Sequence, residues 1–289
     1  MSTASQYRLT GGAPERYEAN MVPALFEPFA RGMLEFAGLR EGERVVDVAC
    51  GTGIVSRLAW PQIAPSGCLV GLDLNAGMLE IARKALQEAT GSIEYKEGDA
   101  TSLPFSDAEF DVAICHHGLQ YFPDRSEALR EMHRVLQDAG RLVVSVWRPV
   151  EHNPGHSVLA DVLDRRVGEE AGATRRAPFR LSDRGEIRDL VEGAGFSDVA
   201  IQLDARVARF PSAEAMIRIM MGGTPLAAAM QDTDPGVLET VIAEVTGELS
   251  AYEDDLGLAL PMQAWIITAR AGGCCRGGAG PRDARRPPP

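Results

Sequence analysis

The stretch VVDVACGTGIV, Val45 to Val55, is the strongest indication of the fold in the first half of this 289-residue chain. It has the pattern of a buried β-strand that ends in an acidic residue and is followed by a glycine turn and the start of a helix. Backbone N–H groups and a helix N-terminus around such a turn favour a carboxylate or a phosphate. Gly51 and Gly53 lack a Cβ, so the main chain can turn sharply there and approach a ligand closely. The stretch therefore predicts a binding site for a small ligand.

Two nucleotide-binding patterns share this strand–turn–helix plan. A nicotinamide-dinucleotide site requires Gly-x-Gly-x-x-Gly or Ala, whose third small residue lets the helix pack closely on the strand. Here Ser56 occupies that third position, and Asp47 precedes the glycines, where the dinucleotide pattern requires no acid. A P-loop is excluded because no Gly-Lys-Ser/Thr sequence follows the turn. An ordinary tight turn also explains an isolated Gly-x-Gly. The segments that follow therefore determine whether this turn belongs to a nucleotide-binding site.

Four further apolar segments follow, and the stretches between them have helical periodicity. Strands that alternate with helices predict a parallel sheet covered on both faces. Ligands of such sheets bind outside the carboxyl ends of the strands, at the topological switch point. The predicted strands are CLVGLDLN (Cys68–Asn75), SIEYKEGDA (Ser92–Ala100), FDVAICHHGLQYF (Phe110–Phe122) and GRLVVSVW (Gly140–Trp147).

Three acidic residues close neighbouring strands. Asp47, Asp73 and Asp99 each end a predicted strand and follow one another at intervals of 26 residues. One acid at a strand end is commonly a helix cap or a turn residue. Three acids in register on neighbouring strands are hard to explain in that way. We therefore expect all three to line one crevice.

These residues resemble the class I S-adenosylmethionine-dependent methyltransferases, and among them the small-molecule branch that includes the ubiquinone/menaquinone-biosynthesis C-methyltransferases. The resemblance covers residues 44–147 and 185–199, through VVDVACGTG, GLDLNAGML, GDATSLPFSDAEFD and EALREMHRVLQDAGRLVVS. It implies an α/β fold, a Rossmann-like three-layer sandwich with a mostly parallel seven-stranded sheet whose last strand is antiparallel. Ala49 stands where the family commonly has glycine, which narrows the gap beside the turn by one methyl group.

The resemblance also implies which residues bind S-adenosylmethionine. The backbone from Ala49 to Gly53 would hold the methionine part, Asp73 would accept both ribose hydroxyls, and Asp99 would accept from the adenine amino group. An ionised carboxylate only accepts hydrogen bonds, which suits a diol or an exocyclic amine. The other predicted cofactor contacts are Leu74 and Met78 packed on the adenine, the N–H of Ala100, and Asp47, Cys50, Gly51, His116 and Tyr17.

Methyl transfer from a sulfonium is an in-line displacement, so the protein contributes alignment, desolvation and, for some acceptors, a base. His116 and His117 follow the predicted fourth strand at the crevice mouth and are the candidate catalytic bases. A structural hydrogen bond or a cofactor contact is the alternative for both, and His116 fits a cofactor neighbour better than a proton acceptor. His152 and His156, past the fifth strand, are weaker candidates, and His133 is predicted to be structural.

We expect one methyltransferase domain over residues 1–271, with a cofactor-binding core at 41–148. Residues 1–40 are amphipathic and are predicted to form a helical lid or, as an alternative of equal weight, a cover for the sheet edge. Residues 149–183 and 212–256 are predicted to be helical insertions over the substrate.

Two segments outside the core carry more specific predictions. A methionine stripe in the second insertion fits either a soft pocket lining or an ordinary core. Its members are Met216, Met220, Met221 and Met230. Residues 272–289 are rich in Gly, Pro and Arg, and we expect them to be a disordered tail.

Composition limits the partners. The net charge of −12 argues against a nucleic-acid partner. No apolar run approaches the length of a membrane span, the first residues lack a signal-peptide core, and the five cysteines show no C-x-x-C pairing. We therefore expect a cytoplasmic bacterial protein that has neither a membrane segment nor a metal site.

The residues after the fourth strand indicate the class of acceptor. Relatives that methylate amino groups of DNA bases or of glutamine typically have Asn-Pro-Pro-Tyr there, whereas this chain has Cys115-His116-His117-Gly118. We predict methyl transfer to a small organic acceptor, aromatic or polyketide-like, with S-adenosylhomocysteine as by-product. The alternatives are an S-adenosylmethionine-binding enzyme of the same fold with other chemistry, a nicotinamide-dependent oxidoreductase and a non-catalytic scaffold. The acceptor atom and the oligomeric state stay open.

Overall fold

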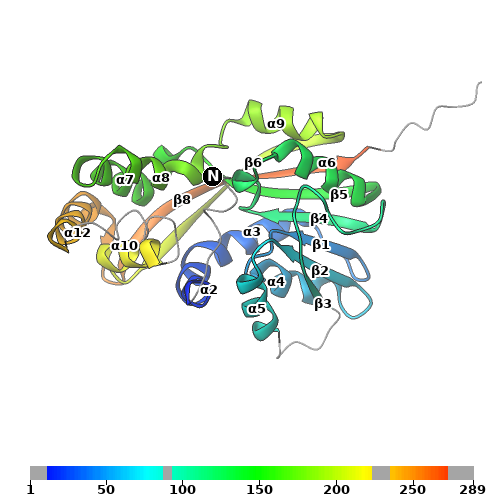
Figure 1. Cartoon of the computed structure of the whole chain (residues 1–289), viewed down its shortest axis with the longest axis horizontal. Coiled ribbons are helices and arrows are strands. Elements are labelled where there is room, and N and C mark those ends of the chain that lie inside the picture. Colours follow the sequence, from blue (N-terminus) through cyan, green and yellow to red (C-terminus); the bar gives the residue numbers. More distant parts are fainter. Residues whose placement is uncertain (1–11, 87–92, 223–234, 273–289) are drawn as a thin grey trace, which may run out of the picture.

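The computed structural model describes residues 12–86, 93–222 and 235–272 (Figure 1). A sheet with helices on both faces forms the core, and a helical lobe lies beyond one end of it. The order of the strands is β3-β2-β1-β4-β5-β8-β6, and β7 pairs only with β8. The strands are β1 (Arg44–Val48), β2 (Cys68–Asp73), β3 (Ile93–Glu97), β4 (Phe110–His116), β5 (Leu136–Trp147), β6 (Phe196–Phe210), β7 (Glu253–Asp254) and β8 (Gly257–Ala271).

Strands β1 to β5 are parallel, and β8 runs antiparallel between β5 and β6. This arrangement confirms the predicted Rossmann-like sheet with an antiparallel last strand, to which the structure adds the two-residue β7. From β1 the chain proceeds outward through β2 and β3, and it then returns to the other side of β1 with β4 and β5. The direction of winding therefore changes between β1 and β4, where sheets of this kind bind their ligands.

The strand boundaries differ from the prediction at β4. The predicted strand continued to Phe122, but β4 ends at His116 and a 3₁₀ turn, η2 (Leu119–Tyr121), follows. His117 adopts a left-handed backbone conformation with φ +51°, which a continuing strand does not accommodate. The chain leaves the sheet there, and the 3₁₀ turn follows at the carboxyl end of β4.

Each face of the sheet buries a helical layer. Helices α3 (Glu27–Ala37), α4 (Ile54–Ile63) and α5 (Ala76–Ala85) cover one face, and α6 (Arg125–Val135) and α9 (Arg184–Gly193) cover the other (Figure 1). Apolar residues at helical spacing point inward from each layer, as the sequence pattern predicted. Examples are Met33, Ala59 and Ile63 on the first face and Leu129, Met132 and Val191 on the second, all fully buried.

The helical lobe is built on the two longest strands. Strands β6 and β8 continue past the core and carry α7 (Pro154–Arg166), α8 (Glu169–Arg176), α10 (Ala213–Gly222) and α12 (Pro235–Leu249) at their far end (Figure 1). The 3₁₀ turns η3 (Val150–His152), η4 (Ala177–Phe179) and η5 (Ser250–Tyr252) join these elements. The lobe has its own apolar core, which is continuous with residues of the N-terminal segment.

The N-terminal segment begins with the short helix α2 (Ala13–Arg16) and the π-helix η1 (Tyr17–Phe26) before α3. Pro23 lies inside η1, and a proline removes one backbone donor from a helix. Met21 and Leu25 of η1 pack into the core of the helical lobe, and α3 packs on the sheet. The segment thus joins the core to the lobe.

The methionine stripe belongs to the core of the lobe. Met216 and Met220 are fully buried there, and Met221 packs against the same cluster from a partly buried position. The pocket-lining interpretation is therefore wrong for these three residues, because their helix turns that face toward α12 and β6. Met230 and the predicted tail at 273–289 lie outside the described residues. Within the described ranges, no helix is long and apolar enough to cross a membrane.

We expect Met216→Ala to lower the free energy of unfolding by about 2–5 kcal/mol, because it leaves a cavity in this core. Met216→Leu conserves volume and should cost less than about 1.5 kcal/mol. Urea denaturation of both variants measures the difference. An alanine variant as stable as the parent would contradict the burial of Met216.

Candidate functional site

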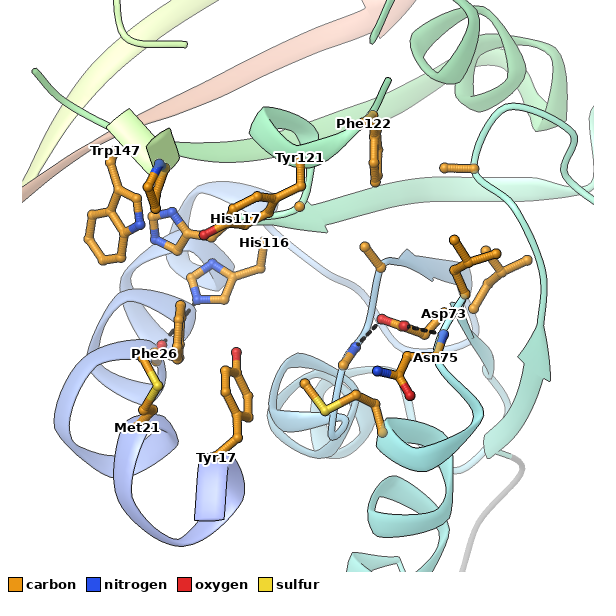
Figure 2. A pocket seen from close by; sticks show the side chains of 18 of the residues that line it. Tyr17, Met21, Phe26, Asp73, Asn75, His116, His117, Tyr121, Phe122 and Trp147 are labelled. Carbon is orange, nitrogen blue, oxygen red and sulfur yellow. Dashed lines mark hydrogen bonds between the residues drawn. The ribbon is translucent and has the colours of Figure 1, made fainter. Parts of the chain in front are cut away.

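A cavity of about 270 Å³ lies at the carboxyl ends of the parallel strands. Figure 2 shows Tyr17 and Phe26 of η1 on one side, together with His117 and Trp147, and Asp73 on the other side. Helix α8 and the turn η4 add residues from the helical lobe. Sites for small molecules commonly have volumes of about 300–1,000 Å³ and mostly apolar walls, and this cavity is close to that size.

The turn after β1 forms one wall and depends on two residue positions. Ala49 has φ +60°, a left-handed conformation that costs alanine roughly 1–2 kcal/mol, and it lines the cavity. Gly53 has φ +81°, and a Cβ there would clash with the hydroxyl group of Tyr95. Glycine is therefore required at position 53, where it is the N-cap residue of α4. Gly53 lines no part of the cavity, so its contribution to the site is the path of the backbone.

Asp73 closes β2 and faces the cavity (Figure 2). One carboxylate oxygen accepts a hydrogen bond from the backbone N–H of Gly51 at 2.8 Å, and the other accepts from the N–H of Asn75 at 2.8 Å. Burial raises the pKa of this carboxyl, although both backbone donors oppose that change. The two bonds fix the plane of the carboxylate and leave further lone pairs on both oxygens.

Asp99 follows β3 on the cavity wall, and one of its oxygens accepts from the N–H and the hydroxyl of Thr101, both at 2.8 Å. Leu74, Met78 and Ala100 line the same part of the cavity. All five predicted adenosine contacts are therefore brought together. Their roles toward a cofactor stay predictions.

Asp47 lies apart from the other two acids. It is 1% exposed and accepts a hydrogen bond from the hydroxyl of Ser56 at 2.7 Å. It lines a smaller hollow of about 30 Å³ with Cys50, and Ala49, Gly51, Tyr17, Phe26 and His116 line both spaces. The expectation of one crevice is therefore corrected to a cavity and an adjoining hollow. Burial raises the pKa of Asp47 to about 7.

His116 has both ring nitrogens occupied. Nε2 lies 3.1 Å from the carbonyl oxygen of Phe26, which only accepts, so Nε2 carries the proton. Nδ1 then accepts from the hydroxyl of Ser145 at 2.8 Å. Burial lowers the pKa of His116 to about 4. The neutral ring ties the end of β4 to β5 and to η1 and has no free lone pair for a substrate proton.

His117 is the other candidate base, and its surroundings differ. Its ring stacks on Trp147 with centroids 3.8 Å apart, and neither ring nitrogen has a hydrogen-bond partner among the described residues. Burial, and next the neighbouring His116, lower the pKa of His117 well below its usual value. His117 therefore presents a neutral imidazole at the inner end of the cavity.

The helical lobe adds residues that sequence reasoning ranked low or missed. His156 of α7 and Arg175 of α8 both line the cavity and are buried, and a guanidinium nitrogen of Arg175 contacts Nδ1 of His156. Trp147, at the end of β5, closes the inner wall. Arg175 carried no sequence signal, because its position depends on how α8 packs on α7. His152 is exposed and contacts Arg148, and His133 packs its ring edge-on against Phe196.

Comparison with known proteins agrees with this arrangement. The family "Methyltransferase domain" matches residues 46–144. The ubiquinone/menaquinone biosynthesis C-methyltransferase UbiE of Ectopseudomonas mendocina is 38% identical over 136 residues, or 46% of this chain and 52% of that protein. UbiE of Cronobacter sakazakii is 32% identical over 183 residues, which cover 58% of this chain and 72% of that protein. This chain is a class I S-adenosylmethionine-dependent methyltransferase by family.

Solved structures support the fold of this methyltransferase. The YcgJ protein of Bacillus subtilis superposes with a TM-score of 0.57 at 21% identity, over 85% of this chain and 98% of that one. Phosphoethanolamine N-methyltransferase 2 of Haemonchus contortus, solved with S-adenosyl-L-methionine, gives 0.55 at 16% identity, over 85% and 52%. The chain matches about half the length of the first UbiE relatives, and the helical lobe lies outside the matched methyltransferase domain.

Asp47 makes the stability of the ligand-free methyltransferase depend on pH. Its native pKa of about 7 exceeds the ordinary value of 3.8, so the native state loses stability as pH rises between these values. Asp47→Asn should match the parent near pH 4 and exceed its unfolding free energy by up to about 4 kcal/mol at pH 8. Urea denaturation across that range measures this, with the exposed Asp255→Asn as the control. A constant difference between parent and variant would contradict the burial of an ionisable Asp47.

Proposed function

We propose that this protein transfers the methyl group of S-adenosylmethionine to a small organic acceptor and releases S-adenosylhomocysteine. Membership of the methyltransferase family implies S-adenosylmethionine as the cofactor. The observation that carries the proposal is a cavity in which the acid-bearing ends of β2 and β3 face buried imidazoles across aromatic walls. A nucleoside-binding half and an acceptor half are thus joined in one space.

The residues of the first half fit the cofactor. Asp73 is held rigidly by two backbone donors and keeps lone pairs for a ribose diol, and Leu74 and Met78 form an apolar wall for the adenine. In the adjoining hollow, one oxygen of Asp47 is buried without a hydrogen-bond partner among the described residues. That oxygen suits the ammonium group of the methionine part, because a buried acceptor without a donor is costly.

The second half provides alignment and exclusion of water. When bound, the cofactor supplies a methyl group on a positively charged sulfur, which is already activated for displacement. Tyr17, Phe26 and Trp147 close this half with aromatic surface. His117 holds a neutral ring beside them, and we assign it as the proton acceptor for a substrate acidic enough to give its proton to a base of lowered pKa. His116 serves to position η1 over the site.

A dinucleotide oxidoreductase fits less well. The two residues that depart from the dinucleotide pattern, Ser56 and Asp47, hydrogen-bond to each other. Together they form a polar pair under the glycine turn, where the dinucleotide pattern has a small residue for close helix–strand packing. The enclosure of the cavity by η1 and the helical lobe supports a small acceptor with an aromatic or otherwise planar body.

Incubation with S-adenosylmethionine and a panel of small phenols, hydroxybenzoates and amines tests the reaction. Mass spectrometry should detect a product heavier by one methyl substitution together with S-adenosylhomocysteine. Cofactor consumption without a methylated product would instead support other chemistry on the same fold. Thermal stabilisation by NAD(P)H but not by S-adenosylhomocysteine would contradict the cofactor assignment.

Asp73→Ala should raise the dissociation constant for S-adenosylhomocysteine at least about tenfold, because charged hydrogen bonds to the ribose are lost. Isothermal titration calorimetry measures the change, with Asp138→Ala, which removes an exposed carboxylate away from the cavity, as the matched control. Unchanged affinity in Asp73→Ala would show that the ribose assignment is wrong.

A further inference from the structure

The helical lobe places a buried histidine–arginine pair in the acceptor half of the cavity. His156 is 3% exposed and Arg175 is 6% exposed, and both line the cavity beside Thr174 and Pro178. The pair lies outside the strand ends that the proposed function uses for the cofactor. Charged and polar side chains are rarely buried without a specific partner or role.

The framework around His156 holds the ring in one place. The backbone N–H of His156 donates to the carbonyl of Asn153 at 2.9 Å, and the side-chain oxygen of Asn153 accepts from the N–H of Gln263 on β8 at 2.9 Å. The ring of Phe179 meets the imidazole edge-on, with centroids 5.0 Å apart. The start of α7 is thus anchored to the sheet, and the imidazole packs against Phe179 on the cavity wall.

The contact with Arg175 determines the tautomer of His156. A guanidinium has only donors, so Nδ1 of His156 must present its lone pair to Arg175. The remaining proton of the neutral ring is therefore on Nε2. Burial, and next the charge of Arg175, lower the pKa of His156 well below its usual value, which keeps the ring neutral. His156 is consequently locked as a donor through Nε2.

That donor has no acceptor within the described part of the chain. Nε2 of His156 is buried and makes no hydrogen bond to any described residue. A buried donor without an acceptor costs about 1–3 kcal/mol, which a ligand oxygen in the cavity would recover. The adjacent guanidinium makes the local potential positive, so a negatively charged oxygen is favoured over a neutral one.

We propose that Nε2–H of His156 binds an anionic oxygen of the methyl acceptor, and that Arg175 positions this donor and favours the negative charge. The acceptor is then a small planar molecule that carries a carboxylate or a phenolate, with its body against the aromatic surface that Phe26 and Trp147 give to the cavity wall. This inference rests on the proposed function only in that it takes the ligand to be the methyl acceptor. The anion site itself is inferred from His156 and Arg175.

Calorimetry on the full chain saturated with S-adenosylhomocysteine tests the site with matched probes. Salicylate against salicylamide reports on a carboxylate, and 4-nitrophenolate against 4-nitroaniline reports on a phenolate. We expect the anion to bind at least about tenfold tighter than its neutral partner in one of the two pairs. His156→Phe should abolish this preference and leave the affinity for S-adenosylhomocysteine within about twofold. The control His152→Phe, which changes an exposed histidine away from the cavity, should keep the preference.

The outcomes separate this inference from the proposed function. No anion preference in either pair, or a preference that persists in His156→Phe, would overturn the inference. Failure of the parent to bind S-adenosylhomocysteine would contradict the proposed function, and the same titrations without that ligand would still decide the anion site. If His156→Phe loses S-adenosylhomocysteine binding, the anion preference is measured instead in Arg175→Met and Arg175→Lys. The methionine variant should lose the preference and the lysine variant should keep most of it, and an unchanged preference in Arg175→Met would overturn the inference.

Discussion

The hydrogen bond from the N–H of Gly51 to the carboxylate of Asp73 joins the turn after β1 to the end of β2, and the ligand site depends on it. It holds the turn against the neighbouring strand and at the same time orients the carboxylate that faces the cavity. The turn can follow this path because Gly53 is left-handed and lies against the hydroxyl end of Tyr95. The wall of the cavity is therefore set by backbone geometry, and the side chains that line it are placed on a rigid frame.

A second constraint comes from the end of β4. The left-handed backbone at His117 takes the chain off the sheet and turns two consecutive histidines into the same space. Both ring nitrogens of His116 are hydrogen-bonded, one to Ser145 and the other to the carbonyl of Phe26. The same residue type one position later has neither nitrogen bonded among the described residues and stacks on Trp147. The two adjacent histidines, which the sequence alone does not distinguish, thus have different roles. His116 connects β4 to β5 and η1, and His117 presents a neutral ring to the cavity.

Some of the buried polar atoms that have no partner among the described residues lie around the cavity and the adjoining hollow. Asp47, His117 and His156 each have such an atom within the described ranges. Each would cost stability in a ligand-free protein, and burial shifts the pKa of all three toward the neutral form. At these three residues a ligand bound in the cavity or the hollow would supply the missing partners. The acid lies in the hollow and the imidazoles line the cavity, which fits the proposed cofactor with its cationic end and the proposed acceptor with its oxygen groups.

The sequence by itself predicted the parallel sheet and the acids at the ends of the first three strands, because these depend on local apolar runs and on the residues next to each strand end. The family and the antiparallel last strand followed from the resemblance of its motifs. Leu74, Met78 and Ala100 were predicted with them, since they follow those strands directly. Only the tertiary structure decided that Asp47 occupies a separate hollow, that the methionine stripe is core, and that Arg175 meets His156 in the cavity. Such contacts join segments far apart in the chain, such as α8 against α7 and η1 against β4, and no local pattern encodes how two helices pack. Burial and hydrogen-bond partners, which distinguish His116 from His117, arise only when those segments close around the site.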